Sequence, residues 1–225
     1  MAGVEAVVLD LDGLLLESEQ VWDAAKRRLV RERGGHWTDQ ASQRMLGMSS
    51  PEWAAYMRDG LGVPLTVDDI SAEVVRIMAE LYARQLPILP GAAEAVGRLA
   101  EHWPLGLASS SNREVIDLVL ERTDWSGQFA AAVSSEEVPR GKPAPDVYLK
   151  AARRLGGAPE RCVAIEDSAP GIHSAAEAGL AVIAVPNAAY PPGPDALERA
   201  AVVLDSLHDL TPTVVEAARP QARLG

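Results

Sequence analysis

The sequence VVLDLDGLLLES, residues Val7 to Ser18, joins a short apolar run to two closely spaced aspartates. The run VVL is branched and apolar, which is typical of a strand buried in a parallel sheet. Asp10 and Asp12 follow it directly, and residues two apart in an extended chain point to the same side. Two such carboxylates repel each other at a partly dry strand end, so we expect a metal ion or a functional site to compensate them. The alternative from this stretch alone is a solvated Asp-x-Asp-Gly turn.

Composition and charge narrow the class of protein. The chain has 225 residues, of which 48% are hydrophobic and 24% charged, values typical of a globular enzyme with one medium domain or a domain with an insertion. Its net charge of −11 disfavours nucleic acid and anionic membranes as partners. We expect no secretory signal and no membrane span, because no apolar run is long enough. The single cysteine, Cys162, excludes an internal disulfide and predicts a buried thiol and a cytoplasmic location.

The periodicity of the chain changes twice. Residues 18–85 predict helices only, whereas from Gly91 onward helices alternate with short apolar runs at 104–109, 129–134, 162–165, 181–185 and 202–204. Alternating strands and helices predict an α/β fold with a Rossmann-like parallel sheet covered on both faces. The helical block predicts an inserted domain over residues 17–87, and residues 1–16 with 88–225 form the predicted core domain.

In sheets of this kind, ligands bind at the carboxyl ends of the strands. The polar residues predicted at those ends are Asp10, Asp12, Ser109, Ser110, Ser111, Lys142, Glu166 and Asp167. Carboxylates without neighbouring thiols or imidazoles suit Mg²⁺. A lysine and free backbone N–H groups suit phosphate oxygens. A carboxylate can also act as the nucleophile in phosphoryl transfer.

Four separated segments resemble the haloacid dehalogenase-like hydrolase superfamily. They are DLDG at residues 10–13, LASSSN at 107–112, GKPAPD at 141–146 and IEDSAPGI at 165–172. Their order matches the family, and four signals in order are far more specific than one. The helical block after the first segment resembles the helical cap of the subgroup that contains β-phosphoglucomutase and small sugar-phosphate phosphatases.

The resemblance implies a role for each matched residue. Asp10 is implied as the nucleophile that forms an aspartyl-phosphate, and Asp12 as the acid and then the base. Ser109, with the N–H of Ser110, is implied to hold the phosphate, and Lys142 to bridge the phosphate and Asp10. From the residues alone, Ser110 or Ser111 could equally be the functional hydroxyl.

The resemblance also implies the cofactor. Mg²⁺ would be bound by Asp10, Asp167 and the backbone carbonyl of Asp12, and Glu166 would bind or orient the ion. The implied function is a magnesium-dependent phosphatase that acts on a small phosphorylated metabolite, a sugar or polyol phosphate, as a monomer.

Other functions within the superfamily remain as alternatives. A β-phosphoglucomutase would carry a cap arginine and a histidine at positions that match Ser50 and Trp22 here, and both departures disfavour that reading. A phosphonate hydrolase would use a cap lysine as a Schiff base, but Lys26 lies in a KRR run and is expected to be solvated. A binding module without catalysis is a third alternative.

Substrate specificity is expected to come from the hinge and from the turn after the second cap helix. The predicted specificity residues are Leu16, Glu17, Gly47, Met48 and Ser49. We expect Trp22, Trp37 and Trp53 in the core of the insertion, with substrate contact by Trp22 as an alternative. The proline-rich loop at 187–195 is expected to be structural.

Overall fold

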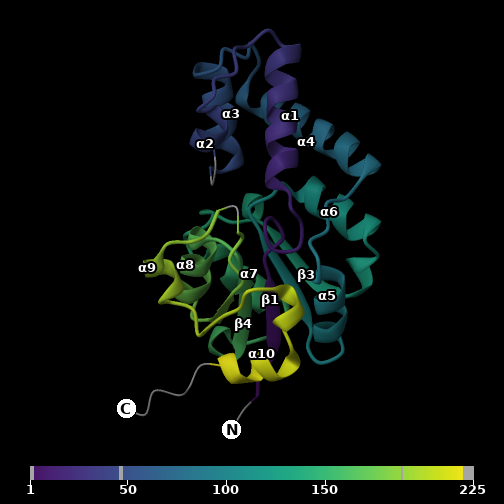
Figure 1. The fold of residues 1–225 in the computed structure, drawn as a ribbon, viewed down its shortest axis with the longest axis vertical. Helices are drawn as coiled ribbons and strands as arrows, with labels where there is room; N and C mark the ends of the chain where they lie inside the picture. Colours follow the sequence, from purple (N-terminus) through teal and green to yellow (C-terminus); the bar gives the residue numbers. More distant parts are fainter. Residues whose placement is uncertain (1–2, 46–47, 189, 220–225) are drawn as a thin grey trace.

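The computed structural model of the chain describes residues 3–45, 48–188 and 190–219 (Figure 1). Its centre is a parallel sheet of six strands in the order β3-β2-β1-β4-β5-β6. The strands are β1 Ala6–Leu9, β2 Leu105–Ser109, β3 Phe129–Ser134, β4 Cys162–Glu166, β5 Ala181–Ala184 and β6 Val202–Val203. The strand β1 lies between β2 and β4. The two aspartates that follow β1 therefore lie near the middle of the row formed by the carboxyl ends of the strands, which is called the sheet edge below.

Helices cover both faces of the sheet, and successive side chains of β1 point alternately to the two faces. Val7 and Leu9 point into one apolar cluster, whereas Ala6 and Val8 point into the other. The first cluster includes α5 Ala92–Ala100, α6 Arg113–Arg122 and α10 Pro212–Ala218. The second includes α7 Asp146–Arg154, α8 Ala169–Glu177 and α9 Pro194–Leu197. The predicted α/β fold class with a parallel sheet is therefore confirmed.

Four helices form a separate lobe over the carboxyl ends of the strands (Figure 1). They are α1 Glu19–Glu32, α2 Ala41–Met45, α3 Ser50–Asp59 and α4 Val67–Arg84. Their apolar faces pack on one another, and α4 also lies against α6 of the core. Ser49 caps α3, because Ser49 and Glu52 form a reciprocal capping box. The exact boundaries at 16/17 and 87/88 stay predictions.

The two segments that join this lobe to the core run side by side. Leu16 forms an antiparallel bridge with Ile88, and the N–H of Glu17 donates to the Pro87 carbonyl at 2.8 Å. This pairing holds the two connecting segments next to each other between the lobe and the core.

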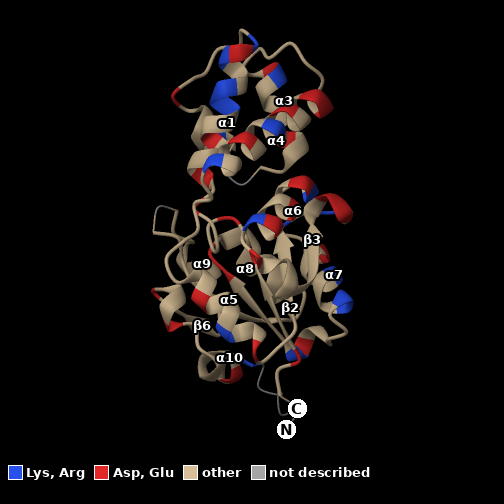
Figure 2. Ribbon diagram, turned by 90° about the vertical axis from the view of Figure 1, so that its right-hand side faces the viewer, with Lys and Arg blue, Asp and Glu red and all other residues tan. Residues whose placement is uncertain are grey.

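Basic and acidic residues are interspersed along the helices of the lobe (Figure 2). Arg28, for example, pairs with Glu32 and with Glu80 across two helices. Such exposed pairs contribute little stability each, so the apolar faces hold the lobe together. Within the described ranges, no helix has the length and apolar character that crossing a membrane requires.

Candidate active site

A buried lysine holds two carboxylates together at the centre of the sheet edge. Lys142, on the loop between β3 and α7, places its Nζ 2.6 Å from Asp10 Oδ1 and 2.6 Å from Glu166 Oε1. All three side chains are nearly inaccessible to solvent. Burial raises the pKa of Asp10 to about 7, although Lys142 acts to lower it. Burial alone would lower the pKa of Lys142, but Asp10 and Glu166 raise it, so the lysine stays charged.

Glu166 is fixed by hydrogen bonds on both of its oxygens. Its Oε1 also accepts from the Tyr148 hydroxyl at 2.8 Å. Its Oε2 accepts from the N–H groups of Asp167 and Ser168 and from the Ser168 hydroxyl. A Cβ at Gly171 would lie 1.8 Å from Glu166 Oε1, so this first turn of α8 admits only glycine beside the carboxylate.

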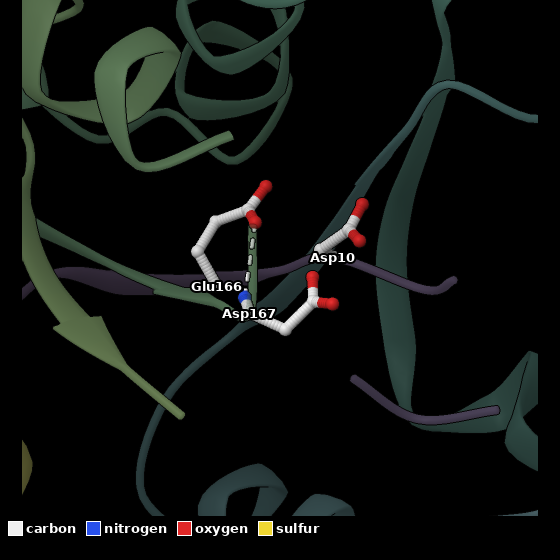
Figure 3. Close-up of side chains that lie close together, drawn as sticks. All are labelled: Asp10, Glu166 and Asp167. Carbon is white, nitrogen blue, oxygen red and sulfur yellow. Dashed lines mark hydrogen bonds between the residues drawn. The ribbon is translucent and has the colours of Figure 1, made fainter. Parts of the chain in front are cut away.

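Asp167 completes a cluster of three carboxylates with Asp10 and Glu166 (Figure 3). One oxygen of each lies within 4.8 Å of the others. The Oδ1 atom of Asp167 is buried without a hydrogen-bond partner among the described residues. Burial, with the charges of Glu166 and Asp10, raises the pKa of Asp167 well above its ordinary value. Gly13, at a φ of +86°, leaves room for it, since a Cβ there would lie 2.2 Å from Asp167 Oδ2.

This cluster fits a hard divalent cation. A buried carboxylate oxygen without a hydrogen-bond partner destabilises the fold. Mg²⁺ binds carboxylate oxygens and would stabilise the ionised form of these carboxyl groups, whose pKa values are raised. The two oxygens of Glu166 already accept hydrogen bonds from five donors. Asp10 and Asp167 are therefore the direct ligands that the geometry favours.

Asp12 is oriented by three donors from two parts of the molecule. The hydroxyls of Ser109 and Ser111 donate to its Oδ2 at 3.0 and 2.6 Å. The indole Nε1 of Trp22, on the helical lobe, donates to its Oδ1 at 3.2 Å. The side chain of Asp12 is thus held by hydrogen bonds from both the core and the lobe.

A cavity of about 380 Å³ lies between the lobe and the sheet edge. Its core wall includes Asp10, Asp12, Lys142 and Asp167, and its lobe wall includes Glu19, Trp22, Lys26, Met45, Met48, Ser50 and Trp53. The loop after β5 adds Asn187, Tyr190, Pro191, Pro192 and Gly193. The expectation that this loop is only structural is corrected, because the loop starts at the carboxyl end of β5 and lines the cavity.

Comparison with known proteins now assigns the family. A family model described as haloacid dehalogenase-like hydrolase matches residues 4–179. The chain belongs to the haloacid dehalogenase-like hydrolase family. Hexitol phosphatase B of Escherichia coli is 34% identical over 188 residues, covering 80% of this chain and 83% of the relative. A bifunctional riboflavin kinase/FMN phosphatase of Arabidopsis thaliana is 34% identical over 183 residues, or 80% of this chain. The match spans only 48% of that longer relative.

The fold comparison agrees. The crystal structure of a CbbY variant from Rhodobacter sphaeroides, in complex with xylulose-(1,5)bisphosphate, superposes with a TM-score of 0.82 at 25% identity. The match covers 95% of this chain and 99% of that one. The chain is therefore a hydrolase of the haloacid dehalogenase-like family with relatives that are phosphatases.

The structure brings most of the sequence-predicted residues to one place. Asp10, Asp12, Ser110, Lys142 and Asp167 all line the cavity. Ser109 is fully buried behind it, where its hydroxyl contacts Asp12 and accepts from the Ser111 N–H at 2.9 Å. Ser111, the alternative candidate for the functional hydroxyl, lines the cavity itself. The phosphate-holding role of Ser109 stays a prediction.

The predicted specificity residues divide differently. Met48 lines the cavity, whereas Glu17 and Ser49 do not. Ser49 instead caps α3, and the backbone of Glu17 pairs with the second connecting segment. Gly47 lies outside the described residues.

Sequence reasoning missed Glu19 and Lys26 on the cavity-facing side of α1, whereas it named substrate contact by Trp22 as an alternative. Lys26, expected to be solvated, is 9% exposed, because the helix face that carries it turns toward Trp22 and Trp53. Glu19, Trp22 and Lys26 follow one another at spacings of three and four residues, and this pattern would have placed them on one helix face.

Proposed function

We propose that this hydrolase cleaves phosphate monoesters of small sugars or polyols through an aspartyl-phosphate, with Mg²⁺ as cofactor. The observation that carries the proposal is the buried contact of Lys142 with Asp10, beside an Asp167 oxygen that has no hydrogen-bond partner among the described residues. A nucleophilic carboxylate and a fixed cation at the same point are what phosphoryl transfer needs. The substrate class is supported by the hexitol phosphatase among the relatives.

Asp10 and Asp167 would hold the Mg²⁺ ion, and Glu166 would orient this site through its hydrogen bonds to Lys142 and to the backbone of Asp167. The ion supplies positive charge that keeps these carboxylates ionised and offsets the charge of the phosphoryl group. Lys142 stays charged between Asp10 and Glu166 and contributes the same compensation from the other side.

Asp10 forms a bond from its carboxylate oxygen to phosphorus, and the ester P–O bond breaks. Asp12 gives a proton to the departing alcohol oxygen. In the second half, Asp12 takes a proton from water as the water oxygen attacks phosphorus, so that phosphate leaves and Asp10 is restored. Trp22, Ser109 and Ser111 hold Asp12 in the orientation that both proton transfers require.

The decisive experiment is phosphate release from a panel of sugar, polyol and nucleotide phosphates. Each is measured with Mg²⁺ and with chelator, for the wild type and for Asp10→Asn. An exposed carboxyl that does not line the cavity, Glu198, supplies the matched control Glu198→Gln. Release that requires Mg²⁺, is lost in Asp10→Asn and persists in the control supports the proposal.

Other outcomes favour the alternatives. Conversion of glucose 1-phosphate to the 6-phosphate in the presence of the bisphosphate, without phosphate release, indicates a phosphomutase. The positions expected to distinguish a mutase are occupied by Ser50, which donates to Asn112 at 3.0 Å, and by Trp22. Tight binding of a phosphometabolite without turnover indicates a binding module.

A further inference from the structure

Among the described residues of the lobe, Lys26 is a buried cation that the chemistry above does not use. Lys26 lies on the face of α1 that lines the cavity, with its Nζ 5.5 Å from the ring centroid of Trp22 and 5.1 Å from that of Trp53. The two indole rings shield the ammonium from bulk solvent while their faces attract it. A lysine held in this way is preorganised rather than a flexible surface group.

Lys26 differs from its neighbours on α1 in its partners. Arg27 pairs with Asp23, and Arg28 pairs with Glu32 and Glu80. Within the described part of the chain, Lys26 has no hydrogen bond or ion pair, and its contacts are the two aromatic rings. Burial lowers its pKa to about 8. The N–H donors of a desolvated ammonium need an acceptor, and the cavity is where one can be supplied.

A carboxylate lies on the same cavity wall. Glu19 is two helical turns before Lys26 on α1 and lines the cavity with it. Burial raises the pKa of Glu19, and Lys26 lowers it from nearby without a direct ion pair. One wall of the cavity thus offers a hydrogen-bond donor and an acceptor at separate points.

We infer that Lys26 and Glu19 bind hydroxyl groups on the alcohol half of the substrate, and that the enzyme selects esters of neutral polyhydroxylated alcohols. A hydroxyl both donates and accepts, so it satisfies either side chain. A second anionic group on the alcohol would be attracted by Lys26 but repelled by the carboxylates of Glu19 and Asp12. The inference rests on the proposed phosphatase function and adds the chemistry by which the substrate is chosen.

The test compares two esters that differ only at the end remote from the phosphate. Sorbitol 6-phosphate ends in a hydroxymethyl group and 6-phosphogluconate ends in a carboxylate, and p-nitrophenyl phosphate serves as the reference without aliphatic hydroxyls. The wild type is expected to prefer sorbitol 6-phosphate. In Lys26→Met, the ratio of kcat/KM for sorbitol 6-phosphate to that for p-nitrophenyl phosphate should fall by about 10- to 100-fold, as for a lost hydrogen bond to a charged group.

Two variants complete the design. Glu19→Gln, which keeps hydrogen-bonding capacity but removes the charge, should raise the relative kcat/KM for 6-phosphogluconate. Arg31→Met removes an exposed cation of the same helix that does not line the cavity, and it should leave both ratios within about two-fold.

The outcomes separate this inference from the proposed function. If the wild type hydrolyses p-nitrophenyl phosphate with Mg²⁺ but Lys26→Met leaves the ratio unchanged, the assignment of Lys26 is wrong and the phosphatase stands. A wild-type preference for 6-phosphogluconate that Lys26→Met abolishes would make Lys26 an anion site and overturn the hydroxyl assignment. Borohydride trapping of a carbonyl substrate on Lys26 would overturn it as well. If no ester is hydrolysed, the proposed function itself fails.

Discussion

The raised pKa of Asp10 predicts a particular pH dependence of stability in metal-free protein. The pKa is about 7 in the fold, against 3.8 in an unfolded chain. Between these values the folded protein keeps a proton on Asp10 that the unfolded chain releases, so stability must fall as pH rises. One such proton changes the free energy of unfolding by at most about 1.4 kcal/mol per pH unit. From pH 5 to pH 7, the loss from Asp10 is therefore about 2 kcal/mol.

Asp10→Asn removes this titration without changing the size of the side chain. In the presence of chelator, Asp10→Asn should gain about 2 kcal/mol relative to the wild type between pH 5 and pH 7. For a chain of this size, that is a change of about 4–8 °C in the difference between the two thermal midpoints. Thermal unfolding at both pH values measures it, with Glu198→Gln as the control that should show no such widening.

Mg²⁺ provides the second arm of this experiment. Because the ion binds the ionised carboxylate, saturating Mg²⁺ should stabilise the wild type at pH 7 and reverse the advantage of Asp10→Asn. A difference between the two proteins that stays constant from pH 5 to pH 7 in chelator would refute the reasoning. It would mean that Lys142 outweighs burial and keeps Asp10 ionised throughout.

Three further changes test single features of the site. Trp22→Phe removes the indole donor to Asp12, and kcat/KM for phosphate release should fall about 10-fold, mostly through kcat. Gly171→Ala places a Cβ against Glu166, so both phosphate release and the thermal midpoint should fall; Gly97→Ala, where a Cβ meets nothing within 4 Å, should lower neither. Chelation should abolish phosphate release, and added Mg²⁺ should restore it, as a colorimetric phosphate assay will show.

The core of this protein was predictable because its signals are local. Short apolar runs between helices, such as the one before Asp10, indicate buried parallel strands. The ends of such strands meet at one edge, so the residues that follow them, Asp10, Lys142 and Asp167 among them, converge without any knowledge of side-chain contacts.

The lobe side of the cavity was not predictable in the same way. The residues of α1 that face the cavity have a spacing that suits either a buried stripe or a binding face. Which one it becomes depends on how α1 is rotated against α4, and that rotation is set by packing between residues far apart in the sequence. From the sequence alone, a basic run such as KRR therefore indicates a solvated helix face. Lys26 is buried instead, because two tryptophans that are 31 residues apart in the sequence pack beside its ammonium group.

The distribution of charge along the cavity explains why the proposed substrate has one phosphate and a neutral remainder. At the core end, the phosphate dianion approaches Asp10 and Asp167, and only Lys142 together with a divalent cation can make that approach favourable. At the lobe end, Lys26 stands with Glu19, so this wall has no net charge to offer a second anion. A substrate with one phosphate and a neutral polyhydroxylated remainder matches both ends, whereas a bisphosphate matches only the first. The same asymmetry argues against a mutase, because a mutase must hold a second phosphate at the end that this chain leaves neutral.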